Sequence, residues 1–103
     1  MRRTTASAAA DSLAPPRAEP YTFGVCSEVL EEIVLVSDDA MREAMRKLFL
    51  DMKLAVEPAG AATTAALCGP LKDRLKGLRV GIITCGANIG VQDHCELLTA
   101  APA

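Results

Sequence analysis

Two short runs of aliphatic residues, 33–36 and 79–84, constrain the fold most, because helical patterns lie between them. The first run reads Ile-Val-Leu-Val, and the second contains Val80, Ile82 and Ile83. Short, β-branched runs of this kind are typical of buried strands. Strands separated by a helical crossover pair in parallel. We therefore expect an α/β fold, in the form of a partial three-layer domain with short parallel strands and covering helices.

The clearest helical pattern follows Ser37. This residue is a favourable N-cap, Asp38 and Asp39 place negative charge on the first turn, and apolar residues then recur at spacings of three and four up to Met52. An amphipathic helix is predicted here. Weaker patterns predict a helix of small residues that begins after Pro58 and stops at Gly69, and further helical segments at 21–30 and 92–98.

Two short strands do not make a sheet that is covered on both faces, as parallel sheets require. The pattern therefore predicts the end of a larger domain, whose unpaired strand edges would cause the isolated chain to aggregate. Composition indicates a globular protein, since 50% of the 103 residues are hydrophobic and the formal net charge is −2. The interspersed charges argue against nucleic acid as the default partner. No apolar run has the length that a membrane span needs.

The four cysteines form no Cys-x-x-Cys pair, and they are interpreted as reduced thiols of a cytoplasmic protein. His94 and Cys95 are adjacent, but without a second pair of ligands they make a poor metal site, so no metal is expected. A nucleophilic Cys85 would need a base, and His94, the one histidine, has no evident orienting partner. The glycines match neither a dinucleotide fingerprint nor a phosphate loop, which argues against a nucleotide.

Ligands of open α/β sheets lie at the carboxyl ends of strands, and Thr-Cys-Gly-Ala-Asn at 84–88 falls at such an end. Glu57, directly before Pro58, lies at a helix N-terminus, where its carboxylate either caps the helix or lines a pocket. These residues alone predict a pocket at a strand end, with Glu57 as a candidate wall, and no particular reaction.

Three segments together, ADSLAPP at 10–16, VSDDAMREAMRKLFLDMKLAVEPAGAA at 36–62 and GLRVGIITCGANI at 77–89, carry a resemblance. They resemble the C-terminal part of pyridoxal-phosphate-dependent threonine/serine dehydratases of the tryptophan synthase β-like superfamily. The resemblance covers residues 10–98, with 1–9 as a non-matching N-terminal tail and 99–103 as a second tail. It implies that the expected α/β unit is the C-terminal part of a larger enzyme fold.

The resemblance implies pyridoxal 5'-phosphate as the cofactor of the complete enzyme, and it implies three cofactor-binding residues. Cys85 would hydrogen-bond the pyridine nitrogen, Gly86 would let the backbone come close, and Glu57 would be a pocket wall. Ala87 stands where the family usually has glycine. If position 87 required a positive φ, alanine would cost about 1 kcal/mol there.

The family's Schiff-base lysine and its glycine-rich phosphate loop are not found in these residues, so no catalytic residue is assigned. Lys47, Lys53, Lys72 and Lys76 are interpreted as solvated. The implied function is that of a C-terminal fragment, inactive alone, of an ammonia-lyase that converts threonine or serine, a small amino-acid substrate, to a 2-oxo acid and ammonia. A homo-oligomer is compatible with this. The alternatives are a racemase or hydroxyaspartate dehydratase of the same fold, or a non-catalytic remnant that binds a partner.

Overall fold

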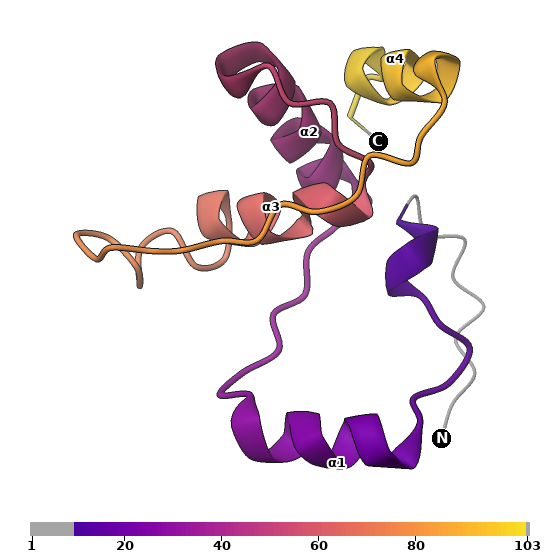
Figure 1. Cartoon of the computed structure of the whole chain (residues 1–103). Helices are drawn as coiled ribbons and strands as arrows, with labels where there is room; N and C mark the ends of the chain where they lie inside the picture. The colour runs from indigo at the N-terminus through magenta and orange to yellow at the C-terminus, as the bar shows by residue number, and fades with distance from the viewer. Residues whose placement is uncertain (1–9, 103) are drawn as a thin grey trace.

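The computed structural model describes residues 10–102, and residues 1–9, which include the expected N-terminal tail, lie outside the described part together with residue 103. Within the described residues the chain is helical, and long irregular segments connect its helices (Figure 1). The elements in order are the 3-10 helix η1 (Asp11–Leu13), α1 (Pro20–Val29), α2 (Asp38–Met52), the 3-10 helix η2 (Ala59–Ala61), α3 (Ala62–Cys68) and α4 (Val91–Thr99). None of the described helices is long and apolar enough to cross a membrane.

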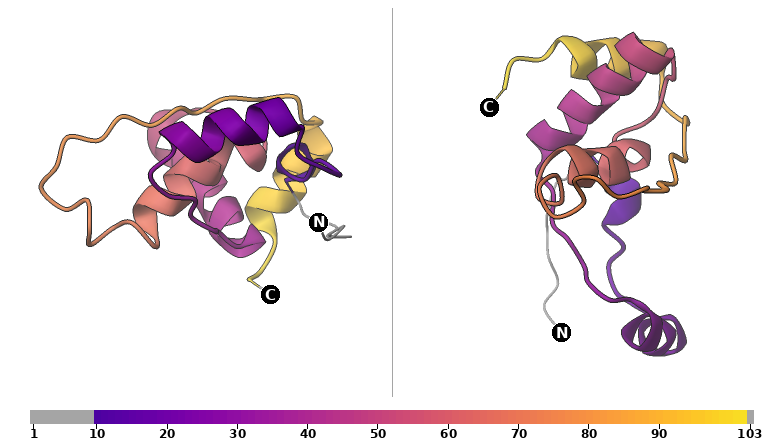
Figure 2. Two further views of the ribbon diagram at one scale, coloured as in Figure 1. Left: turned by 90° about the horizontal axis from the view of Figure 1, so that it is seen from below. Right: turned by 90° about the vertical axis from the view of Figure 1, so that its left-hand side faces the viewer.

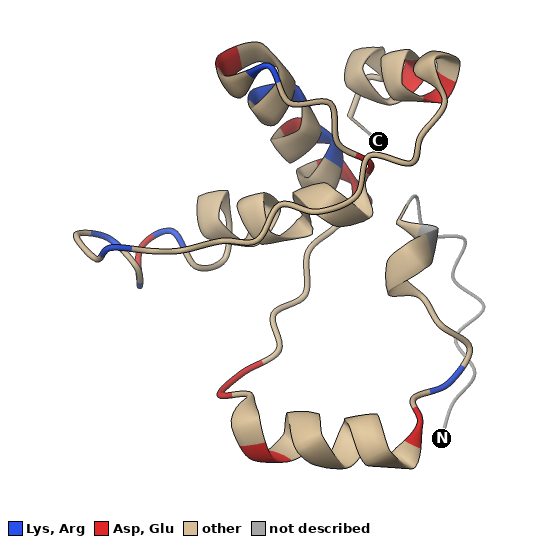
Figure 3. Ribbon diagram, viewed as in Figure 1, with Lys and Arg blue, Asp and Glu red and all other residues tan. Residues whose placement is uncertain are grey.

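Helix α2 is the centre of the packing and forms as its sequence predicts. The Ser37 hydroxyl caps it by accepting a hydrogen bond from the Ala40 amide at 3.1 Å. One face of α2 is buried, and Met45 on that face is wholly inaccessible to solvent. Charged residues lie outside the buried face, among them the exposed Glu43, Lys47 and Asp51, and they colour the ribbon of α2 blue and red in Figure 3, as is usual for an amphipathic helix. The buried core consists of Ala10, Met41, Ala44, Met45, Leu48, Val56, Ala61 and Ala65.

Helix α3 confirms the predicted helix of small residues. The 3-10 turn η2 follows Pro58 and runs directly into α3, and both pack against α2. Ala61 and Ala65 are buried in this contact, because small side chains let two helices approach closely. The chain leaves α3 at Gly69 and continues through turns to residue 77.

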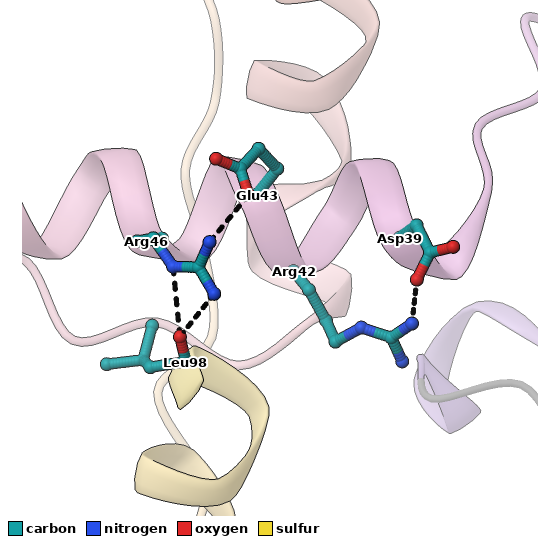
Figure 4. Close-up of polar contacts among 5 residues, drawn as sticks. All are labelled: Asp39, Arg42, Glu43, Arg46 and Leu98. Atoms are coloured by element: carbon teal, nitrogen blue, oxygen red, sulfur yellow. Dashed lines mark hydrogen bonds and ion pairs between the residues drawn. The ribbon is translucent and has the colours of Figure 1, made fainter. Parts of the chain in front are cut away.

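Helix α4 packs on the other side of α2, and an arginine holds its last turn (Figure 4). The Arg46 guanidinium donates two hydrogen bonds to the Leu98 carbonyl, from Nε at 2.9 Å and from Nη2 at 2.6 Å. Its third nitrogen pairs with Glu43 at 2.9 Å. A cation near the last carbonyls of a helix also interacts favourably with the helix dipole.

Helix α1 forms where its pattern predicts, but it packs against none of the other described helices (Figures 1 and 2). None of its residues is buried, and Cys26 alone in it is half-buried. An ion pair between Glu32 and Arg74, at 2.5 Å, links the segment after α1 to the turns after α3.

The predicted parallel strands, and with them the three-layer arrangement, are not confirmed. Residues 33–36 and 79–84 are extended, yet no strand forms anywhere in residues 10–102. The backbone groups of 33–36 make no hydrogen bond to other backbone groups of the described chain. A strand exists only through pairing with a neighbour, and these two segments do not pair with each other.

Candidate functional site

The two sequence motifs singled out as a site lie against each other. The Glu57 amide donates a hydrogen bond to the Gly86 carbonyl at 3.1 Å, which joins the segment before η2 to the end of the second extended run. The Thr63 hydroxyl of α3 donates to the Ile83 carbonyl at 2.7 Å. This second hydrogen bond holds the same extended run against α3. The extended segment therefore runs along the η2–α3 helical unit, as the orange trace in front of α3 in Figure 1 shows.

Two features favour glycine at position 86. Its φ is +87°, a conformation in which a side chain is strained. A Cβ at this position would also contact the Glu57 carboxylate oxygen and would lie 2.9 Å from its Cδ. The absence of a side chain at 86 is what lets the Glu57 carboxylate rest on the backbone.

In the other motif, Gly60 also permits a close approach between two chain segments. A Cβ built on it would contact the Cys85 carbonyl oxygen and would lie 2.9 Å from both the Cys85 carbonyl carbon and the Gly86 oxygen. No separate role for Gly60 was predicted from the sequence. A signal was present, because a glycine among helical alanines is disfavoured and marks a close backbone approach.

The Glu57 side chain is half-buried. Its carboxylate accepts no hydrogen bond from η2 or α3 within residues 10–102, so the capping interpretation is not supported. It lies on Gly86 instead. The positive φ of this loop also falls on Gly86 and not on Ala87, so the alanine that replaces a usual glycine carries no backbone penalty.

Cys85 is exposed and its thiol is free. A thiol is a weak hydrogen-bond donor and a weak acceptor, so Cys85 can pair with a neutral ring nitrogen without transferring a proton to it. We refer to Cys85, Gly86, Glu57 and Gly60 as the candidate wall, because the backbone of residues 85 and 86 lies against Glu57 and Gly60. Its chemical groups are the thiol and the carboxylate.

His94 belongs to the core and not to this wall. It is buried between α2 and α4, and its ring meets the edge of the Phe49 ring with centroids 5.6 Å apart. Its Nε2 is buried and has no hydrogen-bond partner within the described residues. The structure therefore does not present His94 as a surface base for Cys85. Across residues 10–102, no three His, Cys, Asp or Glu side chains gather so as to hold a metal ion.

The chain matches a known protein family over most of its length. The family described as pyridoxal-phosphate dependent enzyme matches residues 1–86. The match includes Glu57, Gly60 and Cys85 and ends at Gly86, so it contains all four residues of the candidate wall, whereas Ala87 and Asn88 of the second motif lie beyond it.

The relatives act on amino acids and are much longer. The phenylserine dehydratase of Ralstonia pickettii is 52% identical over 79 residues, which are 77% of this chain and 24% of that enzyme. The L-threo-3-hydroxyaspartate ammonia-lyase of a Pseudomonas species is 40% identical over 76% of this chain and 24% of that enzyme. The serine racemase of Schizosaccharomyces pombe is 33% identical over 77% and 24%. The chain thus spans about a quarter of the length of these relatives.

Proposed function

The chain belongs to the pyridoxal-phosphate-dependent enzymes, and from that premise we propose that it supplies one wall of the cofactor site in a lyase acting on β-hydroxy amino acids. The observation that carries the proposal is the contact between the two motifs. Glu57 and Gly60 lie directly against Gly86 and Cys85, although the motifs are far apart in the sequence.

The chemistry of these residues suits an aromatic cofactor. The two glycines remove the Cβ atoms that would otherwise separate the chain segments, so the residues that carry the Cys85 thiol and the Glu57 carboxylate lie in adjacent segments. Cys85 is exposed, which leaves its sulfur free to meet a ligand. This wall is open, and the remaining walls are expected from the part of the fold that the relatives carry and these residues do not.

Cys85 is the residue that we propose for the pyridine nitrogen. A thiol, unlike a carboxylate, does not hold a proton on a ring nitrogen, so it orients the ring without fixing a positive charge there. Pyridoxal phosphate, when bound, supplies an electron-withdrawing system that stabilises negative charge at the substrate α-carbon. Glu57 would face the cofactor as a carboxylate that Gly86 keeps in place.

The proposed substrates are small β-hydroxy amino acids such as threonine, serine and their aryl analogues. Phenylserine, 3-hydroxyaspartate and serine, named for the relatives, all have a hydroxyl on the β-carbon. In the net reaction the α-proton and the β-hydroxyl leave as water, and a second water replaces the amino group, so that a 2-oxo acid and ammonia are formed. The higher identity to the phenylserine dehydratase than to the serine racemase favours elimination over racemisation.

We propose that the 103 residues alone do not catalyse this reaction. Lys53 ends α2 and donates to the Leu50 carbonyl at 2.6 Å, Lys47 pairs with Asp51 at 3.0 Å, and Lys72 and Lys76 lie exposed in the turns. None of them belongs to a segment like the family's lysine motif. The four free thiols agree with the cytoplasmic location that we expect.

A chimera tests the proposal in a complete enzyme. In it, the aligned 79 residues of the Ralstonia phenylserine dehydratase are replaced by the matching residues of this chain. We expect the chimera to bind pyridoxal phosphate, seen in its absorption spectrum, and to release ammonia from phenylserine or threonine. Cys85→Ala should weaken cofactor binding about tenfold, as expected for a lost hydrogen bond of about 1.4 kcal/mol.

Two control variants make the result specific. Cys85→Ser keeps a hydrogen-bonding group and should recover most of the affinity. Cys95→Ser alters an exposed cysteine of α4 and should change nothing. A soluble chimera whose cofactor affinity is the same with Cys85 and with alanine would overturn the role of Cys85. A chimera that racemises serine and forms no 2-oxo acid would overturn the proposed reaction.

A further inference from the structure

Two stretches of the chain expose apolar side chains where a folded protein normally buries them. One is α1 with the segment that follows it, where Phe23, Val29 and Leu35 are exposed. The other is the second extended run, with Val80, Ile82 and Ile83. Leu35 and Ile83 are 88% and 76% exposed. Each stretch thus exposes several large apolar side chains close together in the sequence, whereas single exposed apolar residues are usual on a folded protein and indicate no interaction site.

The backbone of both stretches is also open. Residues 33–36 make no backbone hydrogen bond to the described chain, and the second run is held by the Thr63 hydroxyl at the Ile83 carbonyl and by the Glu57 amide at Gly86. Residues 80–91 contain no charged side chain, and this part of the ribbon has no blue or red in Figure 3. An uncharged, extended segment with free amides and carbonyls is a ready edge for a further strand.

The length of the relatives indicates what covers this surface. About three quarters of the phenylserine dehydratase lies outside the part that aligns with this chain. A second copy of this chain would be a poor cover, because it brings only the same two short segments and parallel sheets need helices on both faces.

We infer that α1, residues 33–36 and residues 78–84 form one docking surface. Its partner is the portion of a pyridoxal-phosphate-dependent fold that the relatives carry outside the matched region. The surface binds that portion by strand addition and apolar contact, strongly enough for the two to associate when they are supplied as separate chains. This inference uses the family membership, on which the proposed function also depends, but not the roles proposed for Cys85 and Glu57.

The test is complementation by two separate chains. The full 103-residue chain, carrying an affinity tag, is co-expressed with the Ralstonia phenylserine dehydratase from which the aligned residues have been deleted. We expect the two to elute as an equimolar complex in size-exclusion chromatography with light scattering. In the complex, the amides of residues 33–36 and 79–84 should exchange hydrogen more slowly than in the chain alone.

Three substitutions by lysine locate the surface. Ile83→Lys and Leu35→Lys each place a charge in the proposed contact and should weaken the complex about tenfold or more. Met52→Lys is the matched control, because Met52 is an apolar residue, 62% exposed, that lies at the end of α2 outside the surface. The control should bind like the unsubstituted chain.

Three outcomes would overturn the inference: no co-elution, recovery of the shortened dehydratase only as insoluble protein, or equal effects of all three lysines. Cys85→Ala separates this inference from the proposed function. If the complex forms equally well with alanine at 85 but cofactor affinity is unchanged, the docking surface stands and the cofactor role fails. If the chimera binds cofactor through Cys85 but the separate chains do not associate, the cofactor role stands and the docking surface fails.

Discussion

The Glu57 amide donates to the Gly86 carbonyl at 3.1 Å, and the Glu57 carboxylate lies on the Gly86 α-carbon, where any side chain would collide with it. Glu57 therefore contacts Gly86 through both its backbone and its side chain. This double contact fixes the end of an extended segment that has no sheet to hold it, next to the place where the Cys85 carbonyl lies against Gly60 of η2.

Gly86→Ala should destabilise the chain more than alanine at any glycine that lacks both constraints. The positive φ should cost about 1–2 kcal/mol, and the contact with Glu57 adds to this. Gly77→Ala isolates the first term, because Gly77 has φ +80° and open space around it. Gly81→Ala has neither constraint and should change the free energy of unfolding by less than about 0.5 kcal/mol. Urea titration followed by circular dichroism measures all three, and equal effects would contradict this account of Gly86.

Gly60→Ala should change the free energy of unfolding in the opposite direction from the same substitution in an ordinary helix. In an ordinary helical position, replacing glycine by alanine stabilises a helix by about 1 kcal/mol, and Gly24→Ala in α1, with open space around its α-carbon, should do so. At position 60 the new Cβ would meet the Cys85 carbonyl, so the same substitution should lower the free energy of unfolding. A stabilising effect at both positions would show that the two segments are not in contact.

Much of the helical structure follows from local sequence signals. Ser37 caps α2, the apolar spacing fixes its buried face, and Pro58 and Gly69 mark where the small-residue helical segment begins and ends. Each of these signals acts within a few residues. The strands at 33–36 and 79–84 were predicted by the same local logic and did not form in the described residues, because strand pairing depends on chain segments distant in the sequence.

The candidate site was likewise predicted in part from local sequence signals. The sequence alone predicted a pocket at the strand-like end that carries Cys85 and Gly86, with Glu57 as a candidate wall, and the family resemblance implied their roles toward the cofactor. The contact of Glu57 with Gly86 was not predicted. Gly60 was overlooked, because a close approach between two backbones leaves no pattern except an unexpected glycine among alanines. The positive φ of Gly86, in place of Ala87, depends on the course of the loop around Glu57.

Arg46→Lys should loosen α4. Lysine retains the charge but lacks the planar group that donates from two nitrogens to the Leu98 carbonyl, and we expect a loss of about 0.5–1.5 kcal/mol. Hydrogen exchange should accelerate at the amides of α4 and not at those of α3. Arg17→Lys is the control, because Arg17 makes an exposed ion pair with Glu19, and such pairs contribute little. Unchanged exchange in α4 would show that Arg46 does not hold the helix.

Lys47 gives a prediction for alkaline pH. Its hydrogen bond to Asp51, together with the charge attraction between them, raises the pKa of Lys47 above its ordinary value. The pair is exposed, so its stabilisation of the folded chain is small. This stabilisation is fully present below the unfolded pKa of about 10.4 and is lost as the pH rises through the higher folded pKa. The difference in urea midpoint between the unsubstituted chain and Lys47→Met should be present near neutral pH and vanish in strong alkali. A difference that persists there would contradict the charge-assisted contact.

The most direct test of the central claim, that Cys85 faces the cofactor, is the rate at which its thiol is alkylated in the chimera with and without pyridoxal phosphate. Peptide mass spectrometry reads each cysteine separately, so the exposed Cys68 and Cys95 serve as internal controls in the same sample. If the account is right, the cofactor slows alkylation of Cys85 several-fold and leaves the rates of Cys68 and Cys95 unchanged. If Cys85 reacts at the same rate whether or not the cofactor is bound, the wall formed by Cys85, Gly86 and Glu57 does not face the cofactor and the proposed function loses its support.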